Sequence, residues 1–189
     1  RRLLDLALQQ TFEIRTEAFL GPDAGFVRQW RYLAPLDDPD GGGLDRAYFA
    51  EPAVELDRAF PGKGGKEIRW TALDSPTPGV YYHEMFEHVH QAVAYAATAV
   101  ESPAEQAVEI RTGSDDGIKV WVNGKEVFRN KVTRGASVDQ DRFPATLAKG
   151  WNTILVKVDQ GGGAWSFYFR IVDGQGKGVK LGVDPAKAR

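Results

Sequence analysis

Alternation of apolar and polar side chains is the clearest signal in this sequence, and it predicts β-strands. Ile118, Val120 and Val122 share one side of an extended segment, while Lys119 and Trp121 share the other. The same period of two recurs in four further segments: residues 94–99, 108–111, 154–158 and 165–171. Apolar stripes of this kind are what two packed sheets need to form a core.

Clusters rich in glycine and proline separate these segments and predict turns. The chain contains 21 Gly and 10 Pro, and Asn123-Gly124 supplies the two positive-φ positions of a tight hairpin turn before a return strand at residues 125–129. The first half has longer loops between its candidate strands, which are residues 27–33, 54–56, 67–73 and 80–86. Together the strands and turns indicate an all-β sandwich.

The first twenty residues have a different pattern. Leu3, Leu4, Leu6 and Leu8 recur along residues 1–10, which predicts a short helix. We divide the chain into an N-terminal helix and lead-in at residues 1–20, a β-sandwich domain at residues 21–184 and a tail at residues 185–189. Because residue 1 is Arg and not Met, we expect a processed chain or a piece of a longer protein.

Charge and composition exclude several classes of partner. The 24 Lys and Arg against 26 Asp and Glu give a formal net charge of −2 without a long run of either sign, so we expect neither nucleic acid nor an anionic membrane as a partner. No apolar stretch of the sequence is long enough to cross a bilayer. The absence of cysteine excludes disulfides and thiolate chemistry, and it fits a reducing and an exported location equally.

One motif carries a resemblance to known domains. The run Ser-Asp-Asp-Gly at residues 114–117, followed by a strand and Asn123-Gly124, resembles the signature of protective-antigen-type lectin domains and of galactose-binding-like jelly rolls. Residues 30–36 (Trp-Arg-Tyr-Leu-Ala-Pro-Leu) and 149–157 (Lys-Gly-Trp-Asn and an apolar strand) resemble segments of accessory jelly-roll domains in bacterial extracytoplasmic proteins. The resemblance covers residues 27–172 and implies a two-sheet antiparallel jelly-roll sandwich, here preceded by the short N-terminal helix.

The resemblance also implies a role for Asp115 and Asp116. In protective-antigen-type lectins an adjacent Asp pair joined by a cis peptide binds calcium, which then holds sugar hydroxyls, and hard cations prefer such carboxylate oxygens. The alternative is that both side chains cap the tight turn before the strand, as Asp residues commonly do. One Asp pair supplies too few ligands alone, and Asp139 and Asp141 would add oxygens if their loop folds over the pair. Calcium is therefore the one candidate cofactor.

Sugar recognition needs an aromatic ring face with hydrogen-bonding side chains beside it. Trp121 is the best candidate platform, and the ligand-binding set that we predict is Trp121, Lys119, Asn123 and Asp116. The alternative is that a loop covers this face of the strand and places Trp121 in the core. We assign Trp151 and Trp165 to the core and leave Trp70 open.

All three histidines lie in one cluster at residues 83–90. His88 and His90 would point to one side of a strand, at a spacing that lets two imidazoles share a metal. The alternative is a polar loop or sheet edge. The cluster lacks the His-Glu-x-x-His order of a zinc protease, and the sequence contains no Gly-x-Ser-x-Gly elbow, no phosphate-binding loop and no cysteine nucleophile.

We therefore expect a carbohydrate-binding-like accessory module of a larger extracytoplasmic protein, with no catalytic residues of its own. Its expected partners are a carbohydrate or neighbouring domains of the same chain, and the extracytoplasmic location rests on the resemblance alone. The first alternative is a purely structural sandwich domain that docks on a neighbouring domain. The second is a metal-dependent hydrolase site around His83, His88 and His90.

Overall fold

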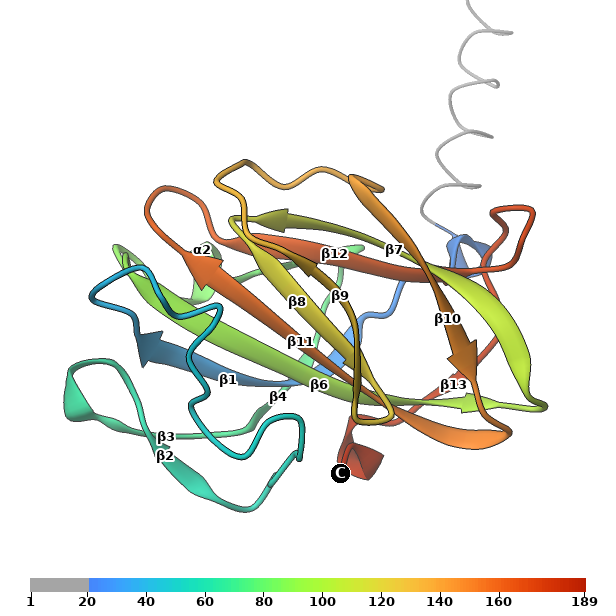
Figure 1. Ribbon diagram of the computed structural model, residues 1–189, viewed down its shortest axis with the longest axis horizontal. Coiled ribbons are helices and arrows are strands. Elements are labelled where there is room, and N and C mark those ends of the chain that lie inside the picture. The colour runs from blue at the N-terminus through green and yellow to red at the C-terminus, as the bar shows by residue number, and fades with distance from the viewer. Residues whose placement is uncertain (1–20) are drawn as a thin grey trace, which may run out of the picture.

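Two antiparallel β-sheets packed face to face make up most of the molecule (Figure 1). The computed structural model describes residues 21–189. The helix expected at residues 1–10 and the rest of the lead-in lie outside the described residues. Within the described range the all-β sandwich expected from the alternating pattern is confirmed.

The larger sheet has seven strands and contains the longest strand pair of the fold. Its strands run in the order β4 (Thr71–Asp74), β1 (Gln29–Asp37), β6 (Ala92–Ser102), β11 (Gly150–Gln160), β8 (Ile118–Val122) and β9 (Lys125–Asn130), with β13 (Gly182–Val183) beside β6. Strands β6 and β11 pair along their whole lengths, from Gly150 opposite Ser102 to Gln160 opposite Ala92. They form the centre of the sheet.

The smaller sheet has four strands and lies across the first. Its order is β10 (Asp141–Leu147), β7 (Gln106–Asp115), β12 (Ser166–Val172) and β5 (Gly79–Tyr81). From β6 onward the chain passes repeatedly between the sheets, as a jelly roll requires: β7, β10 and β12 lie in the smaller sheet, and the strands between them lie in the larger one. The short elements are the hairpin β2 (Ala59–Pro61) and β3 (Glu67–Arg69), the helix α2 (Tyr82–Met85), and the 3-10 turns η1 (Pro22–Ala24), η2 (Lys63–Gly65) and η3 (Pro185–Lys187).

Local sequence explains one tight turn within the larger sheet and one tight connection that leads into it from the smaller sheet. The β8–β9 hairpin turns at Asn123 and Gly124, whose φ angles of 49° and 79° are the positive values expected for this pair. At the start of β11 the fully buried Asn152 donates from Nδ2 to the carbonyl oxygens of Ala148 and Gly150, both at 2.9 Å. The Lys-Gly-Trp-Asn segment therefore shapes the turn into the central strand.

The first hydrophobic core fills the space between the two sheets. The apolar stripes predicted from the sequence meet there: the even-numbered residues 118–122 and 154–158 of the larger sheet face the odd-numbered residues 165–171 of the smaller one. Trp30 packs edge-on against Phe167 and Phe169, with ring centroids 5.4 and 5.5 Å away. Burial of such large side chains is the main favourable contribution to folding, at about 25 cal/mol per Å² of apolar surface.

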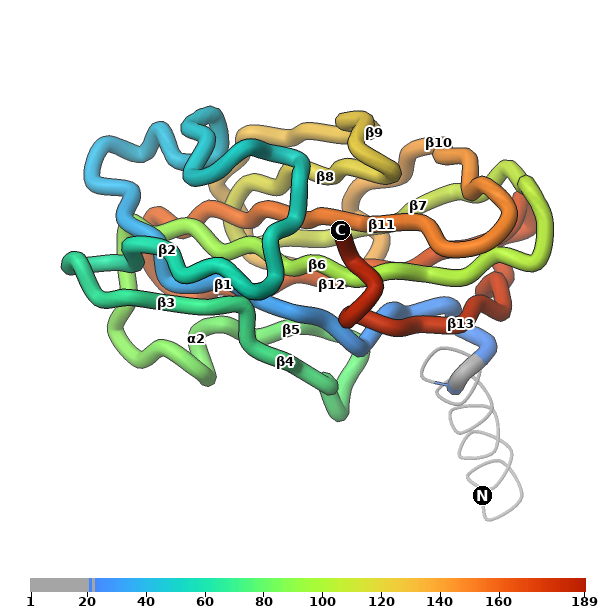
Figure 2. The backbone as a smooth tube through the Cα atoms, turned by 90° about the horizontal axis from the view of Figure 1, so that it is seen from below, coloured from blue at the N-terminus to red at the C-terminus, as the bar shows by residue number. Residues whose placement is uncertain are grey.

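A second core lies on the outer face of the larger sheet. Residues 38–60, which we call the covering segment, and the β2–β3 hairpin lie across this face, as Figure 2 shows. Leu155 of β11 and Tyr95 of β6 point into this core, and Trp121 joins them with only 5% of its surface exposed. The strand β6 is therefore buried on both sides from Ala92 to Val100, because cores lie above and below it.

One charged side chain points into the second core. Lys157 of β11 is fully buried, and its Nζ donates to the Arg46 carbonyl oxygen at 2.6 Å and to Glu51 Oε1 at 3.1 Å. Tyr95 also donates its hydroxyl to Glu51 Oε1. Burial lowers the pKa of Lys157, and the Glu51 carboxylate opposes that shift. Because Arg46 and Glu51 both belong to the covering segment, this ion pair fastens the segment to the sheet.

The structure corrects several assignments made from the sequence. Trp151 was expected in the core but is 37% exposed, because it lies beyond the covering segment at the start of β11, where Lys187 Nζ sits 4.8 Å from its ring centroid. Trp165 is fully buried as expected. Trp70, which the sequence does not assign, is buried in the second core. Residues 54–56 form no strand, and the strand expected at residues 80–86 ends at Tyr81, directly before α2 begins at Tyr82.

The last residues of the chain pack onto the larger sheet. Ala188 is fully buried in the second core, and Thr153 Oγ1 donates to the Arg189 carbonyl oxygen at 3.1 Å. The tail boundary that we placed at residue 184 stays a prediction. None of the helices in residues 21–189 is both long and apolar enough to span a membrane.

We expect the Lys157→Met variant to be strongly destabilised, because it leaves Glu51, whose side chain is 9% exposed, without its counter-ion. Breaking one partner of a buried pair costs about 3–5 kcal/mol. Urea unfolding of Lys157→Met and of the double variant Lys157→Met/Glu51→Gln measures this cost, and the double variant should recover most of it. A single variant that loses less than about 1 kcal/mol would contradict the role given to the pair.

We also expect stability to fall steeply at alkaline pH. Burial raises the pKa of Tyr48 from 10.0 to about 12, and burial likewise raises the pKa of Tyr82 and, together with the Glu51 charge, that of Tyr95. In the unfolded chain these phenols ionise near pH 10, so the stabilising contribution is complete below that pH and is lost as pH rises toward 12. Circular dichroism and tyrosinate absorbance followed together should change in one transition. Full ionisation of the tyrosines without unfolding would refute this account.

Candidate functional site

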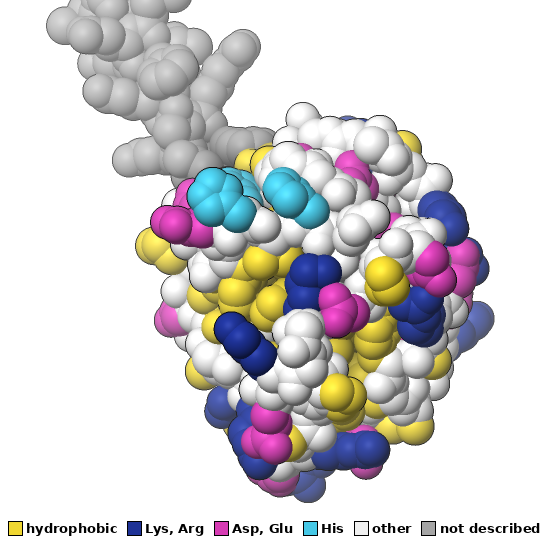
Figure 3. All heavy atoms as spheres, turned by 90° about the vertical axis from the view of Figure 1, so that its left-hand side faces the viewer, with side chains coloured by type: hydrophobic (Ala, Val, Ile, Leu, Met, Phe, Trp, Pro, Cys, Tyr) yellow, Lys and Arg dark blue, Asp and Glu magenta, His cyan; other side chains and the backbone are white. Residues whose placement is uncertain are grey.

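The chain gathers most of its predicted functional residues at one end of the sandwich, the left-hand end in Figure 1. Strands β1, β7 and β11 end there, and β6, β8 and β12 begin there, so loops distant in sequence meet. Figure 3 views this end directly and shows histidine side chains at one edge, with acidic and basic side chains and apolar groups around them. We call this face the loop end.

The Asp115–Asp116 pair lies at the loop end, between β7 and β8. Both residues are buried, with 8% and 6% of their surfaces exposed, and the peptide bond between them is cis. Asp116 Oδ1 accepts from the Arg134 N–H at 3.0 Å, and Oδ2 accepts from the Gly161 N–H at 2.9 Å. The Asp116 carbonyl oxygen accepts from Ser114 Oγ at 2.6 Å. Backbone donors from two other loops therefore hold Asp116 in place.

Asp115 carries a less compensated charge than its neighbour. The pKa of Asp115 is raised to about 6, mainly by burial and also by the nearby Asp116 carboxylate, while His83 acts in the opposite direction. The two carboxyl groups thus repel each other at neutral pH, and a cation between them would relieve the repulsion.

The loop between β9 and β10 lies against β7 beside this pair. Gly113 allows the approach, since a Cβ atom at this position would overlap the carbonyl oxygen of Ser137. Arg134 then donates from Nη2 to Ser114 Oγ at 3.0 Å and forms an ion pair with Asp141. Gly113 thus allows the β9–β10 loop to lie close enough to β7 for the Arg134 N–H to reach Asp116.

A pocket of about 440 Å³ opens beside Asp116. We call it the loop-end pocket, and it is lined by residues 38–41, 91, 116, 131–133 and 159–161. Asp159 is one of its walls: its Oδ1 accepts from the Gly117 N–H at 2.7 Å, and burial raises its pKa. Every lining residue belongs to the described part of the chain, and none is aromatic. The pocket is thus suited to hydrogen bonding and charge, not to ring stacking.

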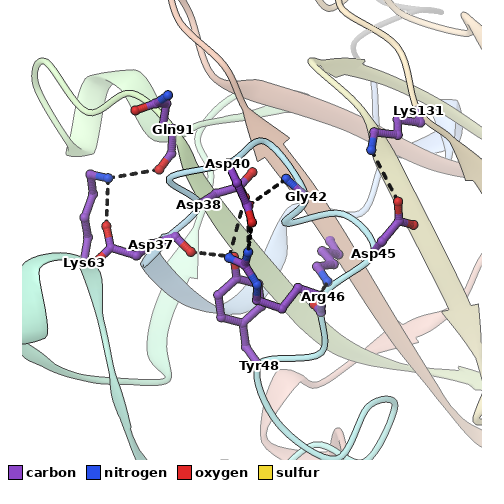
Figure 4. A network of polar contacts seen from close by, with 11 residues as sticks. Asp37, Asp38, Asp40, Gly42, Asp45, Arg46, Tyr48, Lys63, Gln91 and Lys131 are labelled. Carbon is purple, nitrogen blue, oxygen red and sulfur yellow. Dashed lines mark hydrogen bonds and ion pairs between the residues drawn. The ribbon is translucent and has the colours of Figure 1, made fainter.

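The start of the covering segment forms the opposite wall, which Figure 4 shows from close by. Arg46 Nη2 donates hydrogen bonds to both carboxylate oxygens of Asp40, each at 2.6 Å. Arg46 Nη1 lies 3.8 Å from Asp38 Oδ1. Lys131 Nζ, from the facing loop, lies 3.4 Å from Asp45 Oδ2. These ion pairs hold the acidic turn at residues 38–41 against the mouth of the pocket.

The histidine cluster borders a separate hollow on the other side of the glycine loop 161–163. His83 Nδ1 lies 3.1 Å from the Trp165 nitrogen and 3.0 Å from the Trp165 carbonyl oxygen, so His83 joins α2 to the start of β12. His88 and His90 are exposed in a loop, not in the strand that the metal interpretation required. In the described range no three His, Cys, Asp or Glu side chains converge on one metal position.

The predicted ligand-binding set is divided between two places. Asp116 lines the loop-end pocket, whereas Trp121 lies in the second core with Lys119 Nζ 4.8 Å from its ring centroid. Asn123 lies at the far end of β8, where its Nδ2 donates to Asn152 Oδ1 at 2.7 Å. A platform role for Trp121 requires an open ring face, which this conformation does not provide. The role of these residues in ligand binding stays a prediction.

The two acids considered as additional calcium ligands are bound to arginines. Asp139 forms ion pairs with Arg111 and Arg170, which lower its pKa against the effect of burial. Asp141 pairs with Arg134. Their carboxylates therefore stabilise the β7–β10–β12 side of the loop end and do not face the Asp115–Asp116 pair as free ligands.

Sequence reasoning missed the pocket walls at Asp38, Gln160 and Asp159. The Asp-Asp-Pro-Asp-Gly run at residues 37–41 is one of the glycine- and proline-containing clusters that predict turns, and its acidic character is the one available signal of a pocket wall. Asp159 lies two residues after Lys157 in β11, so the alternation places both side chains on the same face of the strand. The alternation does not show which other residues face Asp159.

The residues present fit a calcium ion in part. Asp115 and Asp116 offer adjacent carboxylates, which are the donor type that calcium prefers, and the charge of Asp115 is the less compensated of the two. Because no third acid or histidine of the described chain converges with them, the remaining ligands would be backbone carbonyl oxygens, water or hydroxyls of a bound ligand.

Comparisons with known proteins give no family and only distant structural similarity. No family model matches the chain, and no curated protein matches it. Among solved structures, a PA14 sugar-binding domain from an RTX adhesin has 17% identity over 84% of this chain and 74% of that one, with a TM-score of 0.37. The PA14 domain of the MpAFP antifreeze protein has 15% identity over 85% and 70%, with a TM-score of 0.38.

Two further structures are similar to this chain over a smaller share of their own length. An anti-sigma factor domain-containing protein has 14% identity over 64% of this chain, with a TM-score of 0.47. A β-glucosidase from Kluyveromyces marxianus, in complex with glucose, has 11% identity over 77% of this chain, with a TM-score of 0.48. The chain spans 43% of the first protein and 16% of the second.

Proposed function

We propose that this domain binds carbohydrate at the loop end, through the loop-end pocket and the Asp115–Asp116 pair, as an accessory module of a larger extracytoplasmic protein. The observation that carries the proposal is the buried Asp pair: backbone donors from two loops hold Asp116 at a pocket whose lining is rich in carboxylates and amides. Sugars offer many hydroxyl groups, and a polar, pre-formed pocket recognises them by hydrogen bonds.

Calcium is the proposed cofactor, with Asp115 and Asp116 as its protein ligands. The ion would hold sugar hydroxyls at the pocket and neutralise the repulsion between the two carboxylates. The support is the uncompensated negative charge of Asp115, whose pKa is raised to about 6 by burial and by the neighbouring Asp116 carboxylate. A turn-capping role, the alternative drawn from the sequence, accounts less well for Asp115, whose buried carboxylate gains no neutralising partner from it.

The two other functions considered from the sequence have less support in the described residues. A hydrolase at His83, His88 and His90 would need a metal, and no group of three ligands converges there in residues 21–189. A docking domain needs an apolar surface, and Trp151 is the one large hydrophobic side chain that is exposed among the described residues. Docking against a neighbouring domain stays a prediction.

The proposal predicts calcium-dependent sugar binding that Asp115→Asn removes. This substitution keeps the side-chain volume and removes one charge of the pair, so calcium affinity should fall at least tenfold, which corresponds to about 1.4 kcal/mol. Calorimetric titration with calcium, followed by a glycan array and calorimetry with calcium or a chelator, measures both steps.

The matched control is Asp23→Asn, which removes the same charge at an exposed position paired with Lys180 and away from the loop end. It should bind calcium and sugar as the unmodified chain does, and thermal unfolding should show that both variants are folded. Sugar binding that is unchanged by chelator and by Asp115→Asn would refute the calcium part. Absence of binding to every sugar, with the fold intact, would refute the function.

A further inference from the structure

The walls of the loop-end pocket carry more negative charge than the protein itself neutralises. Four Asp residues line the pocket, namely Asp38, Asp40, Asp116 and Asp159, against one basic residue, Lys131. Lys131 lies 3.4 Å from Asp45, which does not line the pocket, and Arg46 is held mainly by Asp40. Walls of one sign in a partly buried site attract ligands of the opposite sign.

Two buried oxygens among the lining residues accept no hydrogen bond from the described chain. Asp38 is 2% exposed, and its Oδ1 has the Arg46 Nη1 at 3.8 Å, which is beyond hydrogen-bond distance. Gln160 is 1% exposed, and its Oε1 is also without a partner, although its Nε2 donates to the Gly163 carbonyl oxygen at 3.1 Å. Buried acceptors without donors are uncommon and unfavourable, so both indicate a ligand that donates hydrogen bonds.

The acidic side chains also act on one another across the pocket. Burial raises the pKa of Asp159, and the charges of Asp116 and Asp38 raise it further. Burial raises the pKa of Asp38 as well, with Arg46 opposing that shift. A positive group between these side chains would replace repulsion by attraction, and a neutral hydroxyl would not.

We propose that the loop-end pocket selects sugars that carry a free, protonated amino group, with Asp38 and Asp159 as the residues that set this preference. A primary ammonium group has three N–H donors and no acceptor, which matches a lining of carboxylate and amide oxygens. An N-acetylated or neutral sugar of the same shape lacks the charge. This inference rests on the proposed function, because it names the class of sugar that the same pocket binds.

The test compares two ligands that differ only in acetylation. Calorimetry at slightly acid pH, where the amine is protonated, measures binding of the glucosamine tetramer and the N-acetylglucosamine tetramer to the unmodified chain and to Asp38→Asn, Asp159→Asn and the control Asp23→Asn. We expect the glucosamine tetramer to bind at least tenfold more tightly, as a charge-assisted hydrogen bond implies. Asp159→Asn and Asp38→Asn should each reduce that ratio severalfold, while Asp23→Asn should leave it unchanged.

Four results would overturn the inference, and the first two leave the proposed function unaffected. Equal binding of both tetramers is one, and a preference that survives in both pocket variants, shown to be folded by thermal unfolding, is another. Spermidine that competes as well as the glucosamine tetramer would show a cation site without sugar recognition. A further contradicting result would be that calcium displaces the glucosamine tetramer and that the Asp159→Asn variant no longer binds calcium. The acidic walls would then be a metal site. Failure of the proposed function is distinguishable, because neither tetramer nor any neutral sugar would then bind.

Discussion

The buried amino group of Lys157 determines how the outer half of the structure is assembled. A positive charge in an apolar core is unfavourable unless it is paired and hydrogen-bonded, and here both partners come from the covering segment. One of them is the carbonyl oxygen of Arg46, whose guanidinium group holds the acidic turn at the pocket mouth. The lysine therefore connects the centre of the sheet to a wall of the candidate binding site through one residue.

The strands of the second half could be predicted because their alternation is regular and each has an apolar face. The covering segment could not, since it has no periodicity and its residues are placed by contacts with distant strands. Trp121 and Trp151 show the limit. Both lie on the outer face of the larger sheet, because Trp121 pairs with Leu155 of β11 and Trp151 lies on the same side of β11 as Leu155. Only Trp121 is under the covering segment. Alternation assigns a side chain to a face and does not show whether that face is covered.

The candidate site could be predicted in part for a similar reason. The Asp115–Asp116 pair is contiguous in sequence and belongs to a motif, so its position before a strand was readable. Its surroundings come from residues that are far apart along the chain, namely Asp38 after β1 and Asp159 in β11. Asp139 and Asp141 had the right chemistry but lie beside arginines of other strands. The order of the strands in the two sheets decides which acidic side chains face the pocket and which face an arginine.

The contact between His83 and Trp165 joins two elements that are far apart in the sequence. His83 Nδ1 lies 3.1 Å from the Trp165 nitrogen and 3.0 Å from the Trp165 carbonyl oxygen, and the His83 N–H donates to the same carbonyl oxygen at 3.2 Å. At the other end of the same connection, the Gly161 N–H donates to Asp116. The glycine loop at residues 161–163, which separates the loop-end pocket from the hollow beside the histidine cluster, is therefore anchored on both sides, so a rearrangement of one hollow has to be transmitted through a short tethered partition to the other.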